Sequence, residues 1–366
     1  MAVAFQFGIA VRGGRVKSHA VILLRAWGEI SMEKIVLILF VYVAFLSGCR
    51  ENPTEPQPIK QKILITNEVV FFSSDRDGKA TNIFMMATDG EYVKQITKYG
   101  WGEFAATAIS PDSNQLLFYQ AAPGLDIDVG MDIYIYKIKE DTVIGPITQG
   151  HPGNFSPDGN KFVFSRHTFT MGGGYESIYL YDLRYNSEIK LTEDGKTCFY
   201  PQISPNGNNI CYESAKFWDR DSISCWQLHM MDINGNNITD LTSLKNAYYA
   251  SNPVFTPDGR SIIFWYNEQT WCYDVCKLDL SNHSISYVTK NRFNGRYDIT
   301  SNYKNPSVSK ASNKVYFYSD NVYGDYPHPI EIYSANLDGS DLRKLTQNNF
   351  WDSHPVAGVV YYYVKE

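Results

Sequence analysis

The sequence predicts an all-β domain assembled from repeated units of about 50 residues. Apolar and polar residues alternate in many short runs, whereas the apolar spacing of an amphipathic helix is rare. Aromatic residues make up 15% of the chain and include 27 tyrosines, which favours strands. A turn-forming tetrapeptide also recurs at similar intervals, which indicates an internal repeat.

The recurring tetrapeptide is Ser or Thr, then Pro, then Asp or Asn, and usually Gly. Proline presets the second position of a tight turn, Asp or Asn suits the third, and Gly accepts positive φ at the end. Four copies occupy residues 110–113, 156–159, 204–207 and 256–259. Each precedes an apolar run, at 116–119, 162–165, 210–213 and 262–266, so each is expected to close a β-hairpin.

Two further strands are expected in each of six units. The third strands are predicted over residues 82–87, 132–137, 177–183, 227–233, 274–280 and 331–337. Each fourth strand ends in an aliphatic residue and a threonine, at Thr97, Thr148, Thr192, Thr242, Thr289 and Thr346. Repeated four-stranded units are typical of a β-propeller, whose radial closure protects strand edges. The sequence therefore predicts a six-bladed β-propeller of four-stranded antiparallel blades.

These repeats resemble those of the PD40, or TolB-like, family of WD40-like propellers, and the resemblance extends over residues 62–366. It implies the propeller, but only a short tether stands where TolB carries an α/β domain. The first and last units depart from the turn motif, and the last has Ser309-Lys310-Ala311-Ser312 in its place. Because these units flank the ring closure, residues 359–364 are expected to supply the strand that the first unit lacks, so that strands from both ends of the chain close the ring.

Residues 1–48 are predicted to be a signal peptide region, with translation starting at Met32. Glu33 and Lys34 precede an uncharged apolar run over residues 35–46, which is too short to span a bilayer. The stretch that ends at Cys49 resembles a bacterial lipobox, which implies that Cys49 carries a lipid and begins the mature chain. Residues 49–61 contain three prolines and are expected to form an extended tether.

The predicted location is the cell envelope of a Gram-negative bacterium, with the membrane contacted through the lipid. Arg50, and not the aspartate typical of inner-membrane retention, follows Cys49, which favours an outer membrane lipoprotein facing the periplasm or the cell surface. Removing residues 1–48 takes away five Lys/Arg and two Asp/Glu, which leaves 28 basic and 37 acidic side chains and a formal net charge of −9. Nucleic acid is therefore not expected as a partner.

A candidate binding site is predicted where each fourth strand leads into the next unit. The residue before a proline occupies this position in five places, with the first one residue out of step: His151, Tyr200, Asn252, Asn305 and His354. A closed ring would bring these residues to one mouth of a central channel. A polar and aromatic rim suits a sugar, a peptide or a metal, although Asn and His before proline also serve as ordinary turn residues.

An acidic segment offers a weaker candidate for a metal. Asp126, Asp128 and Asp132 alternate around Gly130, which partly resembles a calcium loop. An EF-hand would also require an acidic ligand near position 12 and flanking helices, so a solvated acidic loop is the alternative. No other cofactor is expected.

Five cysteines follow Cys49, so at least one thiol is left without a disulfide partner. Cys198, Cys211 and Cys225 fall within one unit, where a bridge or burial as small apolar residues are both open. Cys272 and Cys276 lie four residues apart without a second pair at zinc-site spacing, which is weak support for a metal.

The usual hydrolase and nucleotide-binding motifs are absent from the mature sequence. The sequence therefore predicts a noncatalytic scaffold, anchored to the envelope, that binds a protein or a glycan. The alternative is a propeller lyase or hydrolase acting on polysaccharide with a metal at the channel mouth. Such an enzyme would need several His or carboxylate groups within about 3 Å of one reacting atom or metal.

Overall fold

The computed structural model describes residues 63–364, apart from 79, 122–130, 171–172, 194, 196, 216–225, 243–248, 268–272, 291, 294–295, 298–300 and 322–328. The chain divides into two compact units, Met1–Ile59 and Lys60–Glu366, and every described residue belongs to the second. The signal peptide region, Cys49 and the tether predicted over residues 49–61 lie outside the described residues. No helix in the described part of the chain is long and apolar enough to cross a membrane.

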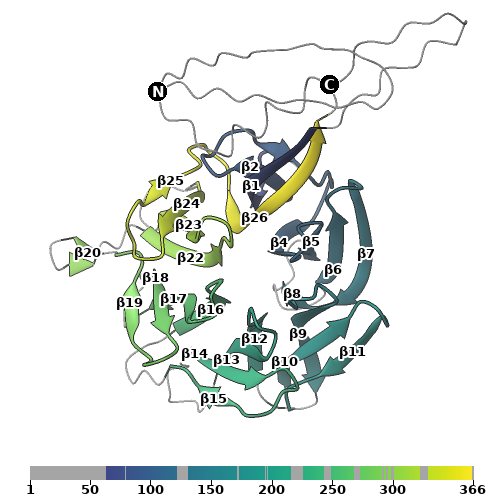
Figure 1. Ribbon diagram of the computed structural model, residues 1–366, viewed down its shortest axis with the longest axis vertical. Coiled ribbons are helices and arrows are strands. Elements are labelled where there is room, and N and C mark those ends of the chain that lie inside the picture. Colours follow the sequence, from purple (N-terminus) through teal and green to yellow (C-terminus); the bar gives the residue numbers. More distant parts are fainter. Residues whose placement is uncertain are drawn as a thin grey trace, which may run out of the picture. The chain divides into compact units, whose positions relative to one another are not determined.

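The strands form small antiparallel sheets arranged around a common centre (Figure 1). Four sheets have four strands each. The first contains β26 (Ser353–Val364), β1 (Ile63–Ser74), β2 (Asn82–Ala87) and β3 (Lys94–Gln95). The second contains β4 (Glu103–Ile109), β5 (Gln115–Ala121), β6 (Asp132–Lys137) and β7 (Thr142–Gln149). The third contains β8 (His151–Phe155), β9 (Lys161–Thr170), β10 (Gly173–Asp182) and β11 (Ser187–Lys190). The fourth contains β22 (Ser301–Val308), β23 (Lys314–Asn321), β24 (Glu331–Asn336) and β25 (Arg343–Lys344).

A fifth sheet has eight strands. One half contains β12 (Thr197–Ile203), β13 (Asn209–Ala215), β14 (Trp226–Asp232) and β15 (Thr239–Asp240). The other contains β16 (Tyr249–Phe255), β17 (Ser261–Asn267), β18 (Asp274–Asp279) and β19 (Ile285–Tyr287). The expectation of six separate blades is therefore corrected: four blades are separate, and the remaining eight strands form one sheet. The physical reason is the parallel pairing of Trp226 in β14 with Tyr249 in β16. A short hairpin of β20 (Arg292–Phe293) and β21 (Arg296–Tyr297) completes the described strands.

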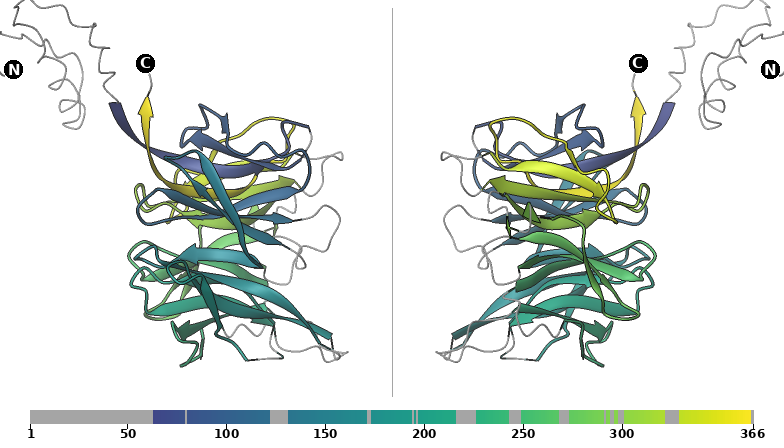
Figure 2. Two further views of the ribbon diagram at one scale, coloured as in Figure 1. Left: turned by 90° about the vertical axis from the view of Figure 1, so that its right-hand side faces the viewer. Right: turned by 90° about the vertical axis from the view of Figure 1, so that its left-hand side faces the viewer.

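The first sheet combines strands from both ends of the propeller. β26 pairs antiparallel with β1 from Ile63 opposite Val364 to Ser73 opposite Ser353. The two strands lie side by side in both views of Figure 2. Phe71 of β1 and Val360 of β26 are fully buried in one apolar cluster. The predicted strand exchange at the ring closure is thus confirmed.

The turn motif stabilises each hairpin through one hydroxyl group. Ser156 Oγ donates to Asp158 Oδ1 and accepts from the Lys161 N–H at 3.0 Å. The Gly159 N–H donates to the Ser156 carbonyl at 2.8 Å, and Gly159 has a φ of 71°. The corresponding hydroxyls of Ser110, Ser204 and Thr256 make the same two side-chain contacts. Satisfying these backbone groups explains why this tetrapeptide marks the hairpins.

The threonine that ends each unit also has a structural role. Thr289 Oγ1 accepts from the Val275 N–H at 2.9 Å and donates to Asp274 Oδ1 at 2.7 Å. Thr97, Thr242 and Thr346 make equivalent bonds, and Thr192 accepts the same backbone bond from Ile178. Thr148 differs, because it lies within β7 and bonds to Glu188 and Arg166. These hydroxyls fasten the end of a unit to its third strand.

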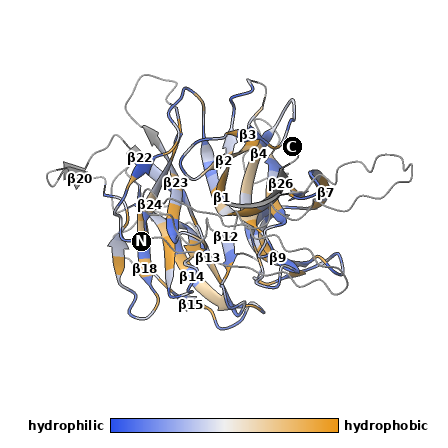
Figure 3. Cartoon of the chain, turned by 45° about the horizontal axis from the view of Figure 1, so that its top comes forward, coloured by the Kyte–Doolittle hydropathy of each residue, from blue (hydrophilic) through white to orange (hydrophobic). Residues whose placement is uncertain are grey.

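Apolar side chains pack in clusters built from the strands. Phe118 and Leu116 of β5 are fully buried against Phe71 of the first sheet, and Phe317 of β23 shares a cluster with Ile263 of β17. Hydrophobic residues concentrate in the strands, while the connecting loops are mainly hydrophilic (Figure 3). The core therefore lies between neighbouring blades, which leaves the inner edges of the sheets free to line a central space.

Candidate functional site

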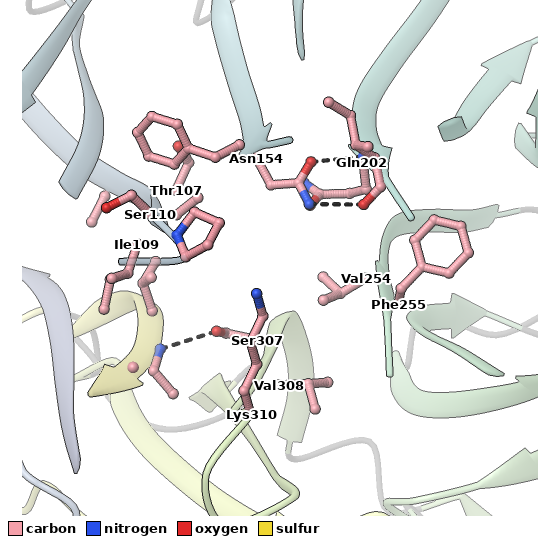
Figure 4. Close-up of a pocket in the computed structure, with 18 of the residues that line it drawn as sticks. Thr107, Ile109, Ser110, Asn154, Gln202, Val254, Phe255, Ser307, Val308 and Lys310 are labelled. Carbon is pink, nitrogen blue, oxygen red and sulfur yellow. Dashed lines mark hydrogen bonds between the residues drawn. The ribbon is translucent and has the colours of Figure 1, made fainter. Parts of the chain in front are cut away.

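One cavity of about 470 Å³ lies at the centre of the propeller. Its lining comes from the inner edge strands of the sheets, namely β4, β8, β12, β16, β22 and β26, together with the turns that follow them. Figure 4 shows side chains from these strands facing one another across the space. The cavity is therefore a channel surrounded by strands far apart in sequence.

All five predicted mouth residues line this cavity: His151, Tyr200, Asn252, Asn305 and His354. The last four have φ values of 48°, 53°, 49° and 49°, respectively, in the left-handed region. Each precedes a proline and lies at a break in the pairing register of its inner strand. The structure thus repeats one uncommon backbone geometry at four points around the channel.

This geometry redirects side chains at some energetic cost. A β-bulge rotates a residue out of the strand alternation and often lies beside a functional site. Asn accepts positive φ comparatively well, whereas Tyr200 and His354 are held there at about 1–3 kcal/mol. His151 does not share the conformation, because the irregularity of β8 falls later, between Pro152 and Phe155. The later position of the irregularity in β8 explains why His151 is one residue out of step with the other four mouth residues.

Aromatic contacts position the two histidines. The His151 ring centroid lies 4.9 Å from Tyr119 and 4.8 Å from Tyr200, the second contact being edge-on. His354 lies 5.7 Å from the ring of Tyr318, and its Nδ1 is 3.0 Å from Ser353 Oγ. The imidazoles are therefore held by packing from neighbouring strands, as a pre-organised binding surface requires.

Both histidines are neutral at pH 7. Burial, followed by repulsion from His354, lowers the pKa of His151 to about 3. Burial also lowers the pKa of His354 to about 4. The Nδ1 atom of His151 is buried and has no hydrogen-bond partner among the described groups. Because leaving a buried polar atom unpaired is costly, this nitrogen adds to the free-energy cost of holding His151 at the mouth.

The predicted calcium ligands are only partly described. Asp126 and Asp128 lie outside the described residues, and Asp132 lies in β6, where Asp132 Oδ1 accepts from Gln149 Nε2 at 3.2 Å. Across the described part of the chain, no group of three or more His, Cys, Asp or Glu side chains is placed to hold a metal ion. The calcium site stays a prediction. At the channel mouth, the candidate metal ligands are the two histidines, His151 and His354.

Three of the described cysteines are buried, namely Cys198, Cys211 and Cys276. Burial raises the pKa of Cys211, since the charged thiolate is disfavoured away from water. Cys225 and Cys272 lie outside the described residues. For the three described cysteines, the structure supports the role of small apolar core residues.

Sequence reasoning missed two features of the channel. Lys310 lines the channel at the position that prolines occupy in four other turns. The sequence contained a signal for it, because Ser309-Lys310-Ala311-Ser312 departs from the turn motif. Asn154 also lines the channel and joins two inner strands: its Nδ2 donates to the Ile203 carbonyl at 3.0 Å, and its Oδ1 accepts from the Ile203 N–H at 2.7 Å. No local sequence signal marks Asn154, because its partner lies 49 positions away.

Comparison with solved structures supports the fold. TolB from Acinetobacter baumannii superposes with a TM-score of 0.61 and 19% identity, covering 80% of this chain and 66% of TolB. A putative TolB from Agrobacterium tumefaciens gives 0.51 and 19%, covering 82% of this chain and 100% of the other. Hydrazine synthase from Kuenenia stuttgartiensis gives 0.58 and 11%, covering 82% of this chain and 47% of the other. At these identities the likeness shows the fold alone.

Comparison of sequences identifies the repeat family. The uncharacterized peptidase YuxL of Bacillus subtilis is 27% identical over 111 residues, which span 30% of this chain but only 16% of that protein. The family PD40, described as the TolB beta propeller domain, matches residues 131–358, which is more than half of the chain. The repeated turns, the terminal threonines and the sheets around one channel agree with that match. The chain therefore belongs to the PD40 family of TolB-type β-propeller domains.

Proposed function

We propose that this protein is a noncatalytic scaffold that binds a protein or a glycan at the mouth of its propeller channel. The observation that carries the proposal is the convergence of His151, Tyr200, Asn252, Asn305 and His354 on one cavity. These side chains come from five different inner strands, and the closed ring gathers them at one mouth. An uncharged polar and aromatic rim suits neutral hydrogen-bonding groups such as amides and hydroxyls.

The backbone strain at the mouth supports the same proposal. Tyr200 and His354 occupy a conformation that Asn would adopt with less strain. The unpartnered Nδ1 of His151 adds a second unfavourable feature on the same rim. Unfavourable features gathered at one place are expected of a binding surface, where the ligand compensates for them.

The test is crosslinking capture with the lipidated, full-length protein in intact cells, with captured molecules identified by mass spectrometry. The paired Tyr200→Ala and Asn252→Ala variant is expected to lose a partner that the unaltered protein captures. Tyr185→Ala is the matched control, since Tyr185 is 73% exposed and lies outside the channel lining. His151→Asn, a milder change, guards against loss of folding, which a thermal melt would reveal. Equal capture by all variants would contradict the proposal.

We also propose that Cys49 anchors the propeller to the cell envelope as an outer membrane lipoprotein. The support is the lipobox-like stretch before Cys49 and the identity of Arg50, together with membership of a family named for an envelope protein. Intact mass of the mature protein is expected to show a diacylated N-terminal cysteine. A retained residue before Cys49, or an unchanged mass and membrane association in Cys49→Ala, would contradict this anchor.

We infer further that the ring functions as six blades, with the eight-stranded sheet counted as two. The support is that six inner strands line the channel and that a single residue pair joins the halves of that sheet. A Trp226→Pro variant, which removes the backbone N–H of one residue of that pair, is expected to fold with unchanged strand content. Global unfolding of this variant would indicate one continuous sheet instead.

A further inference from the structure

The channel has two chemically different ends. Five of the six inner strands, β4, β8, β12, β16 and β22, lead into a turn at the end opposite the mouth. In four of these turns a proline lines the channel: Pro111, Pro157, Pro205 and Pro257. In the turn after β22, Lys310 occupies this position. The end opposite the mouth is therefore a ring of prolines interrupted by one cationic side chain.

Lys310 is the one charged side chain in the described lining, which includes no carboxylate. Figure 4 shows its amino group reaching into the space between the inner strands. Its side chain is exposed to the channel, yet the surrounding strands remove enough bulk water to lower its pKa. None of the described salt bridges involves Lys310. A partly desolvated ammonium group without a counter-charge favours an anionic ligand.

Three polar side chains of the channel lining are already bonded within the protein. Both amide atoms of Asn154 are bonded to Ile203, and Ser307 Oγ accepts from the Ala357 N–H at 3.1 Å (Figure 4). Ser110 Oγ donates to Asp112 and accepts from Gln115. The remaining surface is largely apolar and includes Val254, Phe255 and Val308 beside the prolines. This end therefore offers apolar contact and one cation.

We propose that the channel binds the C-terminal carboxylate of a peptide with an apolar last residue, the carboxylate pairing with Lys310 Nζ. This proposal rests on the proposed binding function and assigns the ligand a class and an orientation. The apolar last side chain packs against the proline ring. The preceding amide groups reach the mouth, where His151 and Asn252 have hydrogen-bonding side chains. Each part of the ligand thus meets a surface of matching polarity.

A uronic acid would also supply a carboxylate, but it fits this end less well. Each sugar ring carries several hydroxyl groups, and hydroxyls buried without partners are strongly unfavourable. Among the polar side chains of the lining, Asn154, Ser307 and Ser110 already form bonds within the protein. An apolar residue ending in a carboxylate leaves no such groups unpaired.

The test uses the full-length protein and a mixture of N-acetylated pentapeptides randomised at the last three positions. The mixture is offered once as free acids and once as C-terminal amides, and retained peptides are quantified by mass spectrometry. Free acids with apolar last residues are expected to be enriched at least tenfold over their amides. Lys310→Met is expected to abolish this preference, whereas Lys139→Met, which removes an exposed lysine outside the channel lining, should retain it.

Equal retention of acids and amides, or no retention of either, would overturn the proposal. An unchanged preference in Lys310→Met would also overturn it. The protein could instead retain digalacturonate and not the peptides, and lose this retention in Lys310→Met. That result would show that Lys310 binds a glycan carboxylate and would overturn the peptide assignment. The capture experiment with the Tyr200→Ala and Asn252→Ala variant distinguishes this inference from the proposed binding function. If capture still depends on the mouth residues while free acids are not preferred over amides, the peptide assignment fails and the binding function stands.

Discussion

Arg76 and Asp352 join the two ends of the propeller although they lie 276 positions apart in the sequence. The Arg76 Nη2 atom donates to both carboxylate oxygens of Asp352, at 2.8 and 2.9 Å. Asp352 is fully buried, and the guanidinium lies 5.0 Å from the ring centroids of Phe72 and Phe84. The pair therefore reinforces, with charge and packing, the closure that β1 and β26 make through their backbones.

Replacing Asp352 with Ala should destabilise the propeller by about 3–5 kcal/mol, because Arg76 would be left partly buried without its counter-charge. Chemical denaturation would measure the loss. Asp341→Ala is the matched control: Asp341 pairs with Lys314 and Arg343 near the surface, where water screens an ion pair and its contribution is small. Equal losses in the two variants would show that Asp352 does not have the role assigned to it.

Deleting residues 359–366 should lower the melting temperature by well over 10 °C, or prevent folding. The deletion removes β26 residues that pair with β1 and exposes the edge of β1 to solvent and aggregation. Removing only residues 365–366 is the control, because these follow β26. Circular dichroism melts would detect the difference, and an unchanged melting temperature after the longer deletion would contradict closure by β26.

Replacing Thr289 with Val should destabilise the fold by about 1–3 kcal/mol, because the Val275 N–H and the Asp274 carboxyl would each lose a buried partner. Val keeps the β-branched shape, so the measurement isolates the hydroxyl. Thr239→Val is the control, since that hydroxyl makes an exposed contact of 3.4 Å with the Met230 carbonyl. If Thr289→Val and Thr239→Val had the same denaturant midpoint within experimental error, the terminal threonines would not stabilise the end of each unit as proposed.

Stability should fall as the pH is lowered from about 6.5 toward 4, partly because of the mouth histidines. The folded protein lowers the pKa of His151 to about 3 and that of His354 to about 4. Between these values and the ordinary 6.5, the unfolded chain binds more protons, so acid favours unfolding. Each histidine contributes at most about 1.4 kcal/mol per pH unit in this window.

His354→Asn tests this, because Asn252 and Asn305 hold the same positive φ at equivalent positions. The variant should lose part of the acid sensitivity seen in denaturation at pH 6.5, 5.5 and 4.5. His283→Asn is the matched control, as His283 is an exposed turn residue that also has positive φ. If the pH dependence of His354→Asn matched that of the unaltered protein, the mouth histidines would not be responsible.

Much of the fold could be predicted because hydrogen bonds between residues close in sequence specify the repeat. The Ser156 hydroxyl bonds to Asp158 and to Lys161, all within five residues, so its turn is specified by neighbours. The Thr289 hydroxyl bonds 14 and 15 positions back, which is still within one unit. The joining of Trp226 to Tyr249 was not predictable, because one pairing between units depends on where the two strand ends meet in space.

The all-β class, the repeated units, the strand exchange at the closure and the register that brings five residues to one channel mouth could all be predicted from the amino-acid sequence. These follow from short-range turn chemistry and strand periodicity, which act within a unit. Two features depend on the assembled ring: burial and the nearby His354 lower the pKa of His151, and Lys310 faces a channel without carboxylates in its described lining. The reason is that burial and electrostatic environment depend on what surrounds a side chain, and here the surroundings come from strands hundreds of residues apart.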